Sequence, residues 1–458
     1  MKNFINEDKI FGILAEAKKP ASEKVSGIVD KSLKLKGLSP EEAAVLLNCE
    51  DGHLLERIFS VSKKVKEDIY GNRLVIFAPL YLSNRCVNNC LYCGFRSANM
   101  KASRNILSFE DIYKEGCILA AEGHKRLLLV AAEDPDVDIE YLEKAISVIY
   151  QKVNGRGAIR RVNVNVAPMD LKDFKRLKMT GIGTYQLFQE TYHQGSYKKL
   201  HPIGPKSDYL KRLYACDTAQ EAGINDVGIG ALFGLYDYKF ETLALLYHAT
   251  HLEEEFGAGP HTISVPRLEP AGGSEVASSP PYPVSDTEIK KVIAVLRLAV
   301  PYTGIILSTR ESAGLRDELF HLGVSQISAG SKTSPGGYGK EGEVQAQFEL
   351  SDHRTLKEVV KDLAGMGFLP SFCTACYRSG RTGEDFMKLA KPGLIKNMCH
   401  PNALLTFEEY LMDYNPELAK GVERFISSEL CKISDPKVRE KVSSKITSIV
   451  NGKRDIYL

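Results

Sequence analysis

The hydrophobic pattern of the chain changes twice along its length. Up to about residue 70, apolar positions recur at helical spacing, as between Val45 and Ile58. The segment 39–42, Ser-Pro-Glu-Glu, combines a capping serine, a proline suited to the first helical position and a glutamate that completes a capping box. Beyond about residue 365 the pattern is helical again, with a further capping-box pattern at 406–409. The sequence therefore predicts helical segments at both ends.

Between these ends, short apolar runs alternate with helical stretches. Helices are predicted to begin after Ser108 and Ser285, each of which is followed by acidic residues typical of a helix start. Strands that alternate with helices favour a parallel sheet, and eight of them favour a (β/α)8 barrel. The runs predicted as strands are Leu74–Leu82, Arg126–Ala131, Val162–Val166, Thr184–Gln189, Asp226–Ala231, Thr262–Pro266, Gly304–Ser308 and Val324–Ala329.

The predicted fold class is therefore α/β, with a TIM-type barrel at the centre of the chain. We expect an N-terminal helical region over 1–72, the barrel over 73–365 and a C-terminal helical domain over 366–458. A Gly/Ser/Pro-rich stretch over 270–283 is predicted as a long loop across one face of the barrel, where loops are often functional.

Composition narrows the class of protein. Of the 458 residues, 43% are hydrophobic, which is enough for a large core. The 60 Lys and Arg nearly balance the 58 Asp and Glu, so nothing in the charge favours a nucleic-acid partner. No apolar run reaches the ~18 residues of a membrane span, and the charged segment 1–9 lacks a signal-peptide core. We therefore expect a cytoplasmic protein with reduced thiols and no membrane partner.

Three cysteines follow the first predicted strand at close spacing. Cys86, Cys90 and Cys93 form a C-x3-C-x2-C motif, with an aromatic residue before the last cysteine. Structural zinc normally takes four protein ligands, whereas a [4Fe–4S] cluster held by three thiolates leaves one iron open to a further ligand. The spacing favours such a cluster; an open zinc site or a coincidence is the alternative.

A second set of cysteines stands near the C-terminus. Cys373 and Cys376 form a C-x2-C pair, and Cys399 follows after 22 intervening residues. Three thiolates again fit a cluster with one open iron. Because His400 adjoins Cys399, a Cys3His zinc site is the alternative that the residues alone leave open.

The first motif, at the carboxyl end of the first barrel strand, resembles that of radical S-adenosylmethionine (SAM) enzymes. With the second set of cysteines, the chain resembles the HydG family of [FeFe]-hydrogenase maturases. The resemblance covers essentially the whole chain, and the C-terminal cysteines distinguish it from the tyrosine lyases of thiamine biosynthesis. Its matching segments are 70–73, 77–81, 373–378, 380–383, 399–404 and 409–411.

This resemblance implies a reaction. The family cleaves L-tyrosine to p-cresol and dehydroglycine, using SAM and a one-electron donor. Dehydroglycine is then converted to CO and cyanide at an auxiliary [4Fe–4S] cluster, which yields an iron–carbonyl–cyanide unit for the hydrogenase active site. The implied partners are therefore L-tyrosine, an external electron donor and other hydrogenase maturation proteins.

The resemblance also implies roles for single residues. SAM completes the first cluster, with Tyr92 against the adenine, Glu133 after the second strand and Glu190 at the ribose hydroxyls. His261 is implied as a ligand of an additional iron that also carries free L-cysteine. Since His261 precedes the predicted sixth strand, this role requires the C-terminal domain to reach the beginning of that strand. For Tyr92 and Glu190 the alternatives are packing and a carboxylate at the barrel rim.

The tyrosine substrate needs a partner for its carboxylate. A buried carboxylate is best held by the two parallel donors of an arginine. Arg310, just after the seventh strand, is the candidate, and Ser328 and Ser331 at the eighth could donate further hydrogen bonds. The alternative for Arg310 is a salt bridge with Glu311.

Two other functions stay open at this point. One is a tyrosine lyase that stops at dehydroglycine, as in thiamine synthesis; the other is a zinc-binding assembly protein without turnover. A lyase acting on another amino acid, such as tryptophan, is also compatible with the residues.

Overall fold

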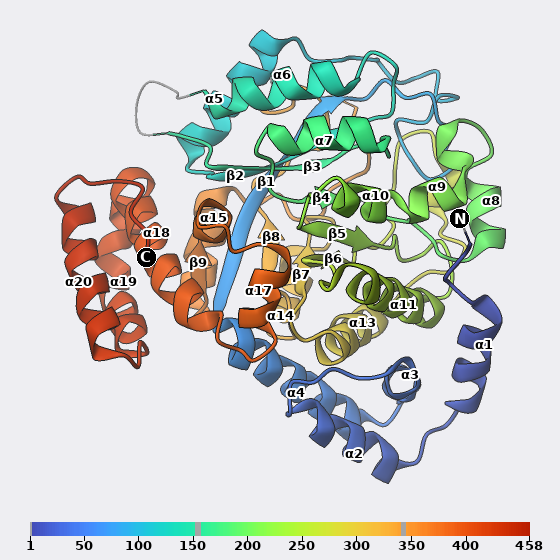
Figure 1. The fold of residues 1–458 in the computed structure, drawn as a ribbon, viewed down its shortest axis with the longest axis horizontal. Coiled ribbons are helices and arrows are strands. Elements are labelled where there is room, and N and C mark those ends of the chain that lie inside the picture. The colour runs from blue at the N-terminus through green and yellow to red at the C-terminus, as the bar shows by residue number, and fades with distance from the viewer. Residues whose placement is uncertain (1, 152–156, 340–344) are drawn as a thin grey trace.

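A closed barrel of eight parallel strands forms the centre of the molecule. The computed structural model describes residues 2–151, 157–339 and 345–458. The strands follow one another around the barrel in chain order, and the pairing of β1 with both β2 and β8 closes it (Figure 1). The strands are β1 Arg73–Ser83, β2 Arg126–Ala131, β3 Arg161–Asn165, β4 Tyr185–Gln186, β5 Val227–Gly230, β6 Thr262–Ser264, β7 Gly304–Leu307 and β8 Gln326–Ser328.

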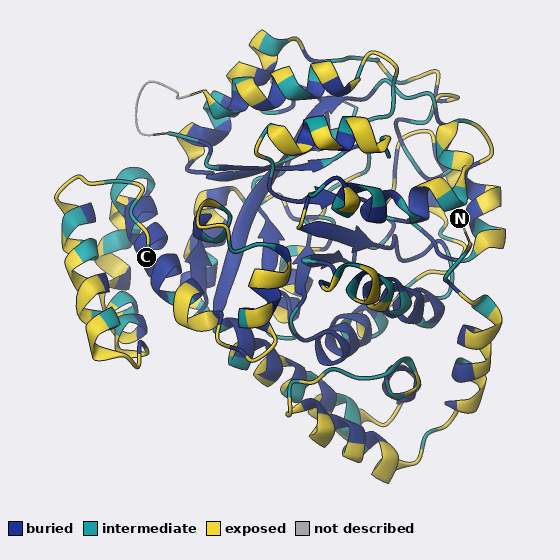
Figure 2. Cartoon of the chain, in the orientation of Figure 1, coloured by how far each residue is buried: buried dark blue, intermediate teal, exposed yellow. Residues whose placement is uncertain are grey.

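Helices cover the outside of the barrel. The strands themselves are almost entirely buried, while the covering helices are buried on one side and exposed on the other (Figure 2). Ser108 and Ser285 cap helices α5 and α13 as predicted. The helical segments that follow β1 to β8 are α5 Phe109–Glu122, α6 Ile139–Tyr150, α7 Leu171–Met179, α8 Gln194–Leu200, the 3-10 turn Pro205–Ser207, α9 Tyr209–Leu213, α10 Ala215–Glu221, α11 Tyr238–Phe256, α12 Glu275–Ser278, α13 Asp286–Ala299, α14 Ala313–Phe320 and α15 Leu356–Gly365.

Helical segments stand at both ends of the chain, so the predicted fold class is confirmed. The N-terminal helices pack on α11 and α13, and the C-terminal ones lie at another side of the barrel (Figure 1). Among the described residues, no helix is long and apolar enough to cross a lipid bilayer. The N-terminal helices are α1 Glu7–Glu16, α2 Ser22–Ser32, α3 Pro40–Leu47 and α4 Gly52–Tyr70. The C-terminal helices are α16 Ala375–Arg378, α17 Gly383–Ala390, α18 Lys396–Tyr414, α19 Pro416–Cys431 and α20 Pro436–Val450.

One strand lies outside the predicted set. β9, Leu369–Ser371, pairs in parallel with Arg73–Val75 at the beginning of β1. The prediction that the chain is helical beyond residue 365 is therefore wrong for these three residues. β9 has three residues with a proline in the middle, so it carries no alternating pattern. It forms because β1 begins before its pairing with β2 does and offers free backbone groups on that edge, opposite to β8.

The capping box predicted at 406–409 is also wrong. Thr406 lies inside α18, where its hydroxyl donates to the carbonyl oxygens of Asn402 and Ala403 in the preceding turn. The same hydroxyl accepts a hydrogen bond from the backbone N–H of Phe372, at 3.2 Å. Thr406 thus ties α18 to the segment that leads from β9 into Cys373.

Candidate functional site

The first cavity opens at the carboxyl ends of the barrel strands, and we call it the upper cavity. All of the residues that the sequence predicted for the radical site and the substrate line it. These are Cys86, Cys90, Cys93, Tyr92, Glu133, Glu190, Arg310, Ser328 and Ser331. They come from the loop after β1 and from the ends of β2, β4, β7 and β8, which is where barrel active sites lie.

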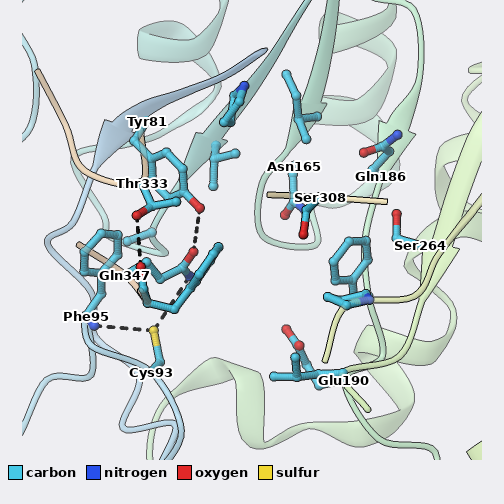
Figure 3. A pocket seen from close by; sticks show the side chains of 18 of the residues that line it. Tyr81, Cys93, Phe95, Asn165, Gln186, Glu190, Ser264, Ser308, Thr333 and Gln347 are labelled. Atoms are coloured by element: carbon cyan, nitrogen blue, oxygen red, sulfur yellow. Dashed lines mark hydrogen bonds between the residues drawn. The ribbon is translucent and has the colours of Figure 1, made fainter. Parts of the chain in front are cut away.

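Amide N–H groups donate hydrogen bonds to two of the three cysteine sulfur atoms in the upper cavity. Cys93 Sγ accepts from the backbone N–H of Phe95 at 3.4 Å and from Gln347 Nε2 at 3.7 Å (Figure 3). Gln347 is itself fixed, since its Oε1 accepts from the Tyr81 hydroxyl at 2.8 Å. Asn88 Nδ2 donates to Cys86 Sγ at 3.7 Å. Donors aimed at sulfur stabilise negative charge on it, as a thiolate ligand of iron requires.

Asn88 is the centre of the loop that carries these cysteines. Its Nδ2 also donates to Glu133 Oε2 at 2.7 Å, and its Oδ1 accepts from the backbone N–H of Lys206 at 2.8 Å. Glu133, which follows β2, therefore fixes the cysteine loop as well as lining the cavity. Sequence reasoning missed Asn88, although its place inside the C-x3-C spacing was a signal that could have found it.

Glu190 has a strained backbone and two cationic partners. Its φ of +71° is in the left-handed region, which is unfavourable for a residue other than glycine and is often found at functional sites. Lys206 Nζ lies 2.6 Å from Glu190 Oε1, and Arg212 Nη2 lies 3.2 Å from the same oxygen. Burial raises the pKa of Glu190, but the two cations outweigh it and lower that pKa below its usual range. Glu190 is therefore an ionised acceptor inside the cavity.

Arg310 has no ion-pair partner among the described residues. Its predicted alternative partner, Glu311, binds Arg267 instead, with Arg267 Nε 3.0 Å from both carboxylate oxygens. The guanidinium of Arg310 lies over the ring of Phe348, and burial lowers its pKa. An unpaired cation that lines the cavity is suited to a carboxylate ligand. The hydroxyl of Ser331 is buried there and has no hydrogen-bond partner in the described part of the chain.

The second cavity lies at the amino ends of the strands, and we call it the lower cavity. Cys373, Cys376, Cys399 and His261 all line it, together with Arg73. The C-terminal segment reaches the beginning of β6, as a role for His261 requires.

His261 is buried among polar and charged groups. Its Nε2 lies 3.2 Å from the hydroxyl of Tyr377. Its Nδ1 lies 3.8 Å from Asp226 Oδ1 and has no hydrogen-bond partner among the residues that the structure describes. Burial lowers the pKa of His261, and Asp226 opposes this only in part. A neutral imidazole is the form that binds metal.

His400 does not join the lower cysteines. Its Nε2 lies 2.9 Å from the backbone oxygen of Glu429 on α19, and it is absent from the residues that line the lower cavity. Across residues 2–151, 157–339 and 345–458, no three His, Cys, Asp or Glu side chains converge on a point that one metal ion could occupy. The Cys3His zinc site is therefore not the arrangement found here.

Comparisons with known proteins agree with this geometry. Residues 80–248 match the model of the radical SAM superfamily, and residues 264–369 match that of the biotin and thiamin synthesis associated domain. The 2-iminoacetate synthase of Escherichia coli (strain K12) is 31% identical over 350 residues, which is 76% of this chain and 90% of that protein.

Two solved structures decide the family. A crystal structure of HydG, described as a maturase of the [FeFe]-hydrogenase, is 53% identical, with a TM-score of 0.97 over 100% of both chains. HydG from Carboxydothermus hydrogenoformans is 45% identical, with a TM-score of 0.85 over 97% of each chain. The chain belongs to the HydG family. The resemblance seen in the cysteine motifs is thus confirmed, and this HydG-family chain is a radical SAM enzyme.

The first prediction concerns Asn88 of this HydG-family chain. Asn88→Ala removes the donor to Cys86 and Glu133 and the acceptor for Lys206, which should loosen the cysteine loop by about 1–3 kcal/mol. After anaerobic reconstitution and gel filtration, the variant should retain less iron than the wild type.

The neighbouring Asn89→Ala is the matched control, because the side-chain oxygen of Asn89 is buried and makes no hydrogen bond to any described residue. Equal iron retention in Asn88→Ala and Asn89→Ala would contradict the role given to Asn88.

Proposed function

We propose that this chain cleaves L-tyrosine to p-cresol and dehydroglycine and converts dehydroglycine to CO and cyanide. The product would be an Fe(CO)(CN) precursor of the [FeFe]-hydrogenase active site. The observation that carries the proposal is the position of two cysteine trios at opposite ends of one barrel, in a chain of the HydG family.

The upper cavity fits a [4Fe–4S] cluster and SAM. Cys86, Cys90 and Cys93 would hold the cluster, and SAM would complete it, with Tyr92, Glu133 and Glu190 as SAM contacts. Together the two groups supply a deoxyadenosyl radical when bound. The chain's own task is to keep water and stray hydrogen donors away from that radical, and the enclosed barrel suits it.

The same cavity fits the amino acid substrate. The cation of Arg310 would bind the carboxylate of L-tyrosine, and the hydroxyls of Ser328 and Ser331 would donate to it. An uncompensated buried cation is costly, so the cavity favours an anionic group at this point. Holding the substrate by its carboxylate fixes the amine and the Cα–Cβ bond relative to the other lining residues.

The lower cavity fits an auxiliary cluster. Cys373, Cys376 and Cys399 would hold a second [4Fe–4S] cluster, and His261 would bind an additional iron that carries free L-cysteine. Arg73 and Arg126 line the same cavity, and Arg126 donates to the backbone oxygen of Cys373. These cations would offset the negative charge of three thiolates and their ligands. When bound, the auxiliary group supplies the iron to which CO and cyanide are delivered.

The reaction also requires other molecules. An external one-electron donor would reduce the upper cluster, and other hydrogenase maturation proteins would receive the product. We propose that the protein works in the cytoplasm, where its ten cysteines stay reduced.

A tyrosine lyase that stops at dehydroglycine is the second candidate. It is favoured by the similarity to E. coli 2-iminoacetate synthase, whose match covers 76% of this chain. The lower cysteine trio and His261, gathered around one cavity, favour the fuller reaction.

The decisive experiment follows both products together. Protein reconstituted anaerobically with iron and sulfide, and given SAM, reductant, cysteine and L-tyrosine, should form p-cresol and CO. Replacing Cys373, Cys376 and Cys399 together by alanine should abolish CO and leave p-cresol formation in place. Replacing Cys86, Cys90 and Cys93 should abolish both. Wild-type p-cresol without CO would support the second candidate instead.

A further prediction tests the substrate carboxylate. Arg310→Gln should raise KM for L-tyrosine about 10- to 100-fold, because a charge-assisted hydrogen bond contributes about 1.5–3 kcal/mol. KM for SAM, measured in the same p-cresol assay, should stay within about twofold and serves as the internal control. An unchanged KM for L-tyrosine would exclude Arg310 as the carboxylate partner.

A further inference from the structure

Tyr92 is fixed by a buried histidine that the catalytic proposal does not use. Tyr92 stands between two cysteines that line the upper cavity, and its hydroxyl lies 2.7 Å from His201 Nε2. Tyr92 is 8% exposed and His201 is 2% exposed. The two rings meet edge to face, with centroids 5.4 Å apart at an interplanar angle of 83°.

The surroundings of His201 determine which partner donates. His201 Nδ1 lies 2.8 Å from the backbone oxygen of Tyr197. Because a carbonyl oxygen can only accept, Nδ1 carries the proton, and a neutral ring then has a lone pair on Nε2. Burial lowers the pKa of His201 to about 3, with Lys206 adding to the effect, so the ring is neutral in the working range of the enzyme. The hydroxyl of Tyr92 is therefore the donor and His201 the acceptor.

His201 belongs to residues 200–206, a segment that is hydrogen-bonded to the cysteine loop. The backbone oxygens of Leu200 and Ile203 accept from Leu91 N at 3.0 Å and from Asn89 N at 3.1 Å. At the end of this segment, Lys206 Nζ lies 5.6 Å from the centroid of the Tyr92 ring and pairs with Glu190. One short segment thus touches the cysteine loop, the Tyr92 ring and Glu190.

We propose that His201 is a positioning residue for SAM, which acts by accepting a hydrogen bond from the Tyr92 hydroxyl and so holding the phenol ring in one orientation. The hydroxyl of Tyr92 is bonded to His201, which is not among the residues that line the upper cavity, and the Tyr92 ring can offer that cavity a flat, apolar surface for a group such as adenine. This rests on the proposed function in one respect, since it takes the upper cavity as the SAM site.

The chain contains a matched pair for comparison. The hydroxyl of Tyr192 lies 2.8 Å from His248 Nδ1, and both residues are buried. Burial also lowers the pKa of His248 to about 3. Neither residue lines the upper cavity. Removing this second tyrosine–histidine hydrogen bond should destabilise the fold about as much as removing the first. It leaves the proposed SAM site unchanged.

The test measures SAM affinity in the full-length, reconstituted protein without turnover. The variants are His201→Phe, Tyr92→Phe, the double variant, His201→Gln and the control His248→Phe, each checked for iron content and melting temperature. His201→Phe and Tyr92→Phe should each weaken the Kd for SAM about five- to tenfold, the value of one hydrogen bond. The double variant should be no weaker than either, because both changes remove the same bond. His201→Gln, which keeps an acceptor, should restore most of the affinity, and His248→Phe should leave it unchanged.

Several results would overturn the inference. They are an unchanged Kd in His201→Phe, additive losses in the double variant, no rescue by glutamine, or an equal loss in His248→Phe. If they occurred while p-cresol and CO were still formed, the proposed function would stand. If the coupling were found but the wild type formed no p-cresol, the substrate assignment would fail and the role of His201 would stand.

Discussion

The length of strand β1 is the constraint on which both sites depend. All eleven residues of β1 are buried, and the strand pairs with β9 and β8 at its beginning and with β2 toward its end. Eleven extended residues span roughly 33 Å, which is enough to connect the two mouths of the barrel. Arg73 at one end lines the lower cavity and Tyr81 near the other end lines the upper one. The first cysteine loop follows the end of β1, and Cys373 and Cys376 follow β9, so one strand fixes the separation of the two sites.

Unpaired cations mark both cavities as sites for anions. Within the described residues, Arg310 in the upper cavity has no ion pair, and the buried Nε of Arg73 in the lower cavity has no hydrogen bond. Buried charges without partners are costly, and natural proteins retain them where a ligand supplies the missing charge. A substrate carboxylate in the upper cavity and a thiolate-bound iron cluster in the lower cavity would supply the missing negative charge.

Much of the fold could be predicted because its signals are local. The capping boxes at Ser39 and Ser285 and the eight apolar runs depend on neighbours in sequence, and the structure contains each of them. β9 could not be predicted in this way, because it exists only where β1 leaves backbone groups unpaired. Thr406 carries a capping pattern that α18 overrides, since its hydroxyl bonds to the turn before it.

The same contrast between local and long-range signals applies to the candidate site. The clustered cysteines can be recognised from their spacing in the sequence, but the groups that orient them come from distant segments. Gln347 reaches Cys93 across 254 positions, and His201 reaches Tyr92 across 109. No pattern in the sequence links such pairs, because the barrel alone brings the carboxyl ends of its strands together.

Iron and sulfide content tests the central claim, two clusters on two separate trios, most directly. The account predicts about eight sulfides per reconstituted chain, with about eight cluster irons and one additional iron at His261, and about four sulfides when either the upper or the lower trio is replaced by alanine. Zinc in place of iron at either trio, or a full iron content in either variant, would contradict it.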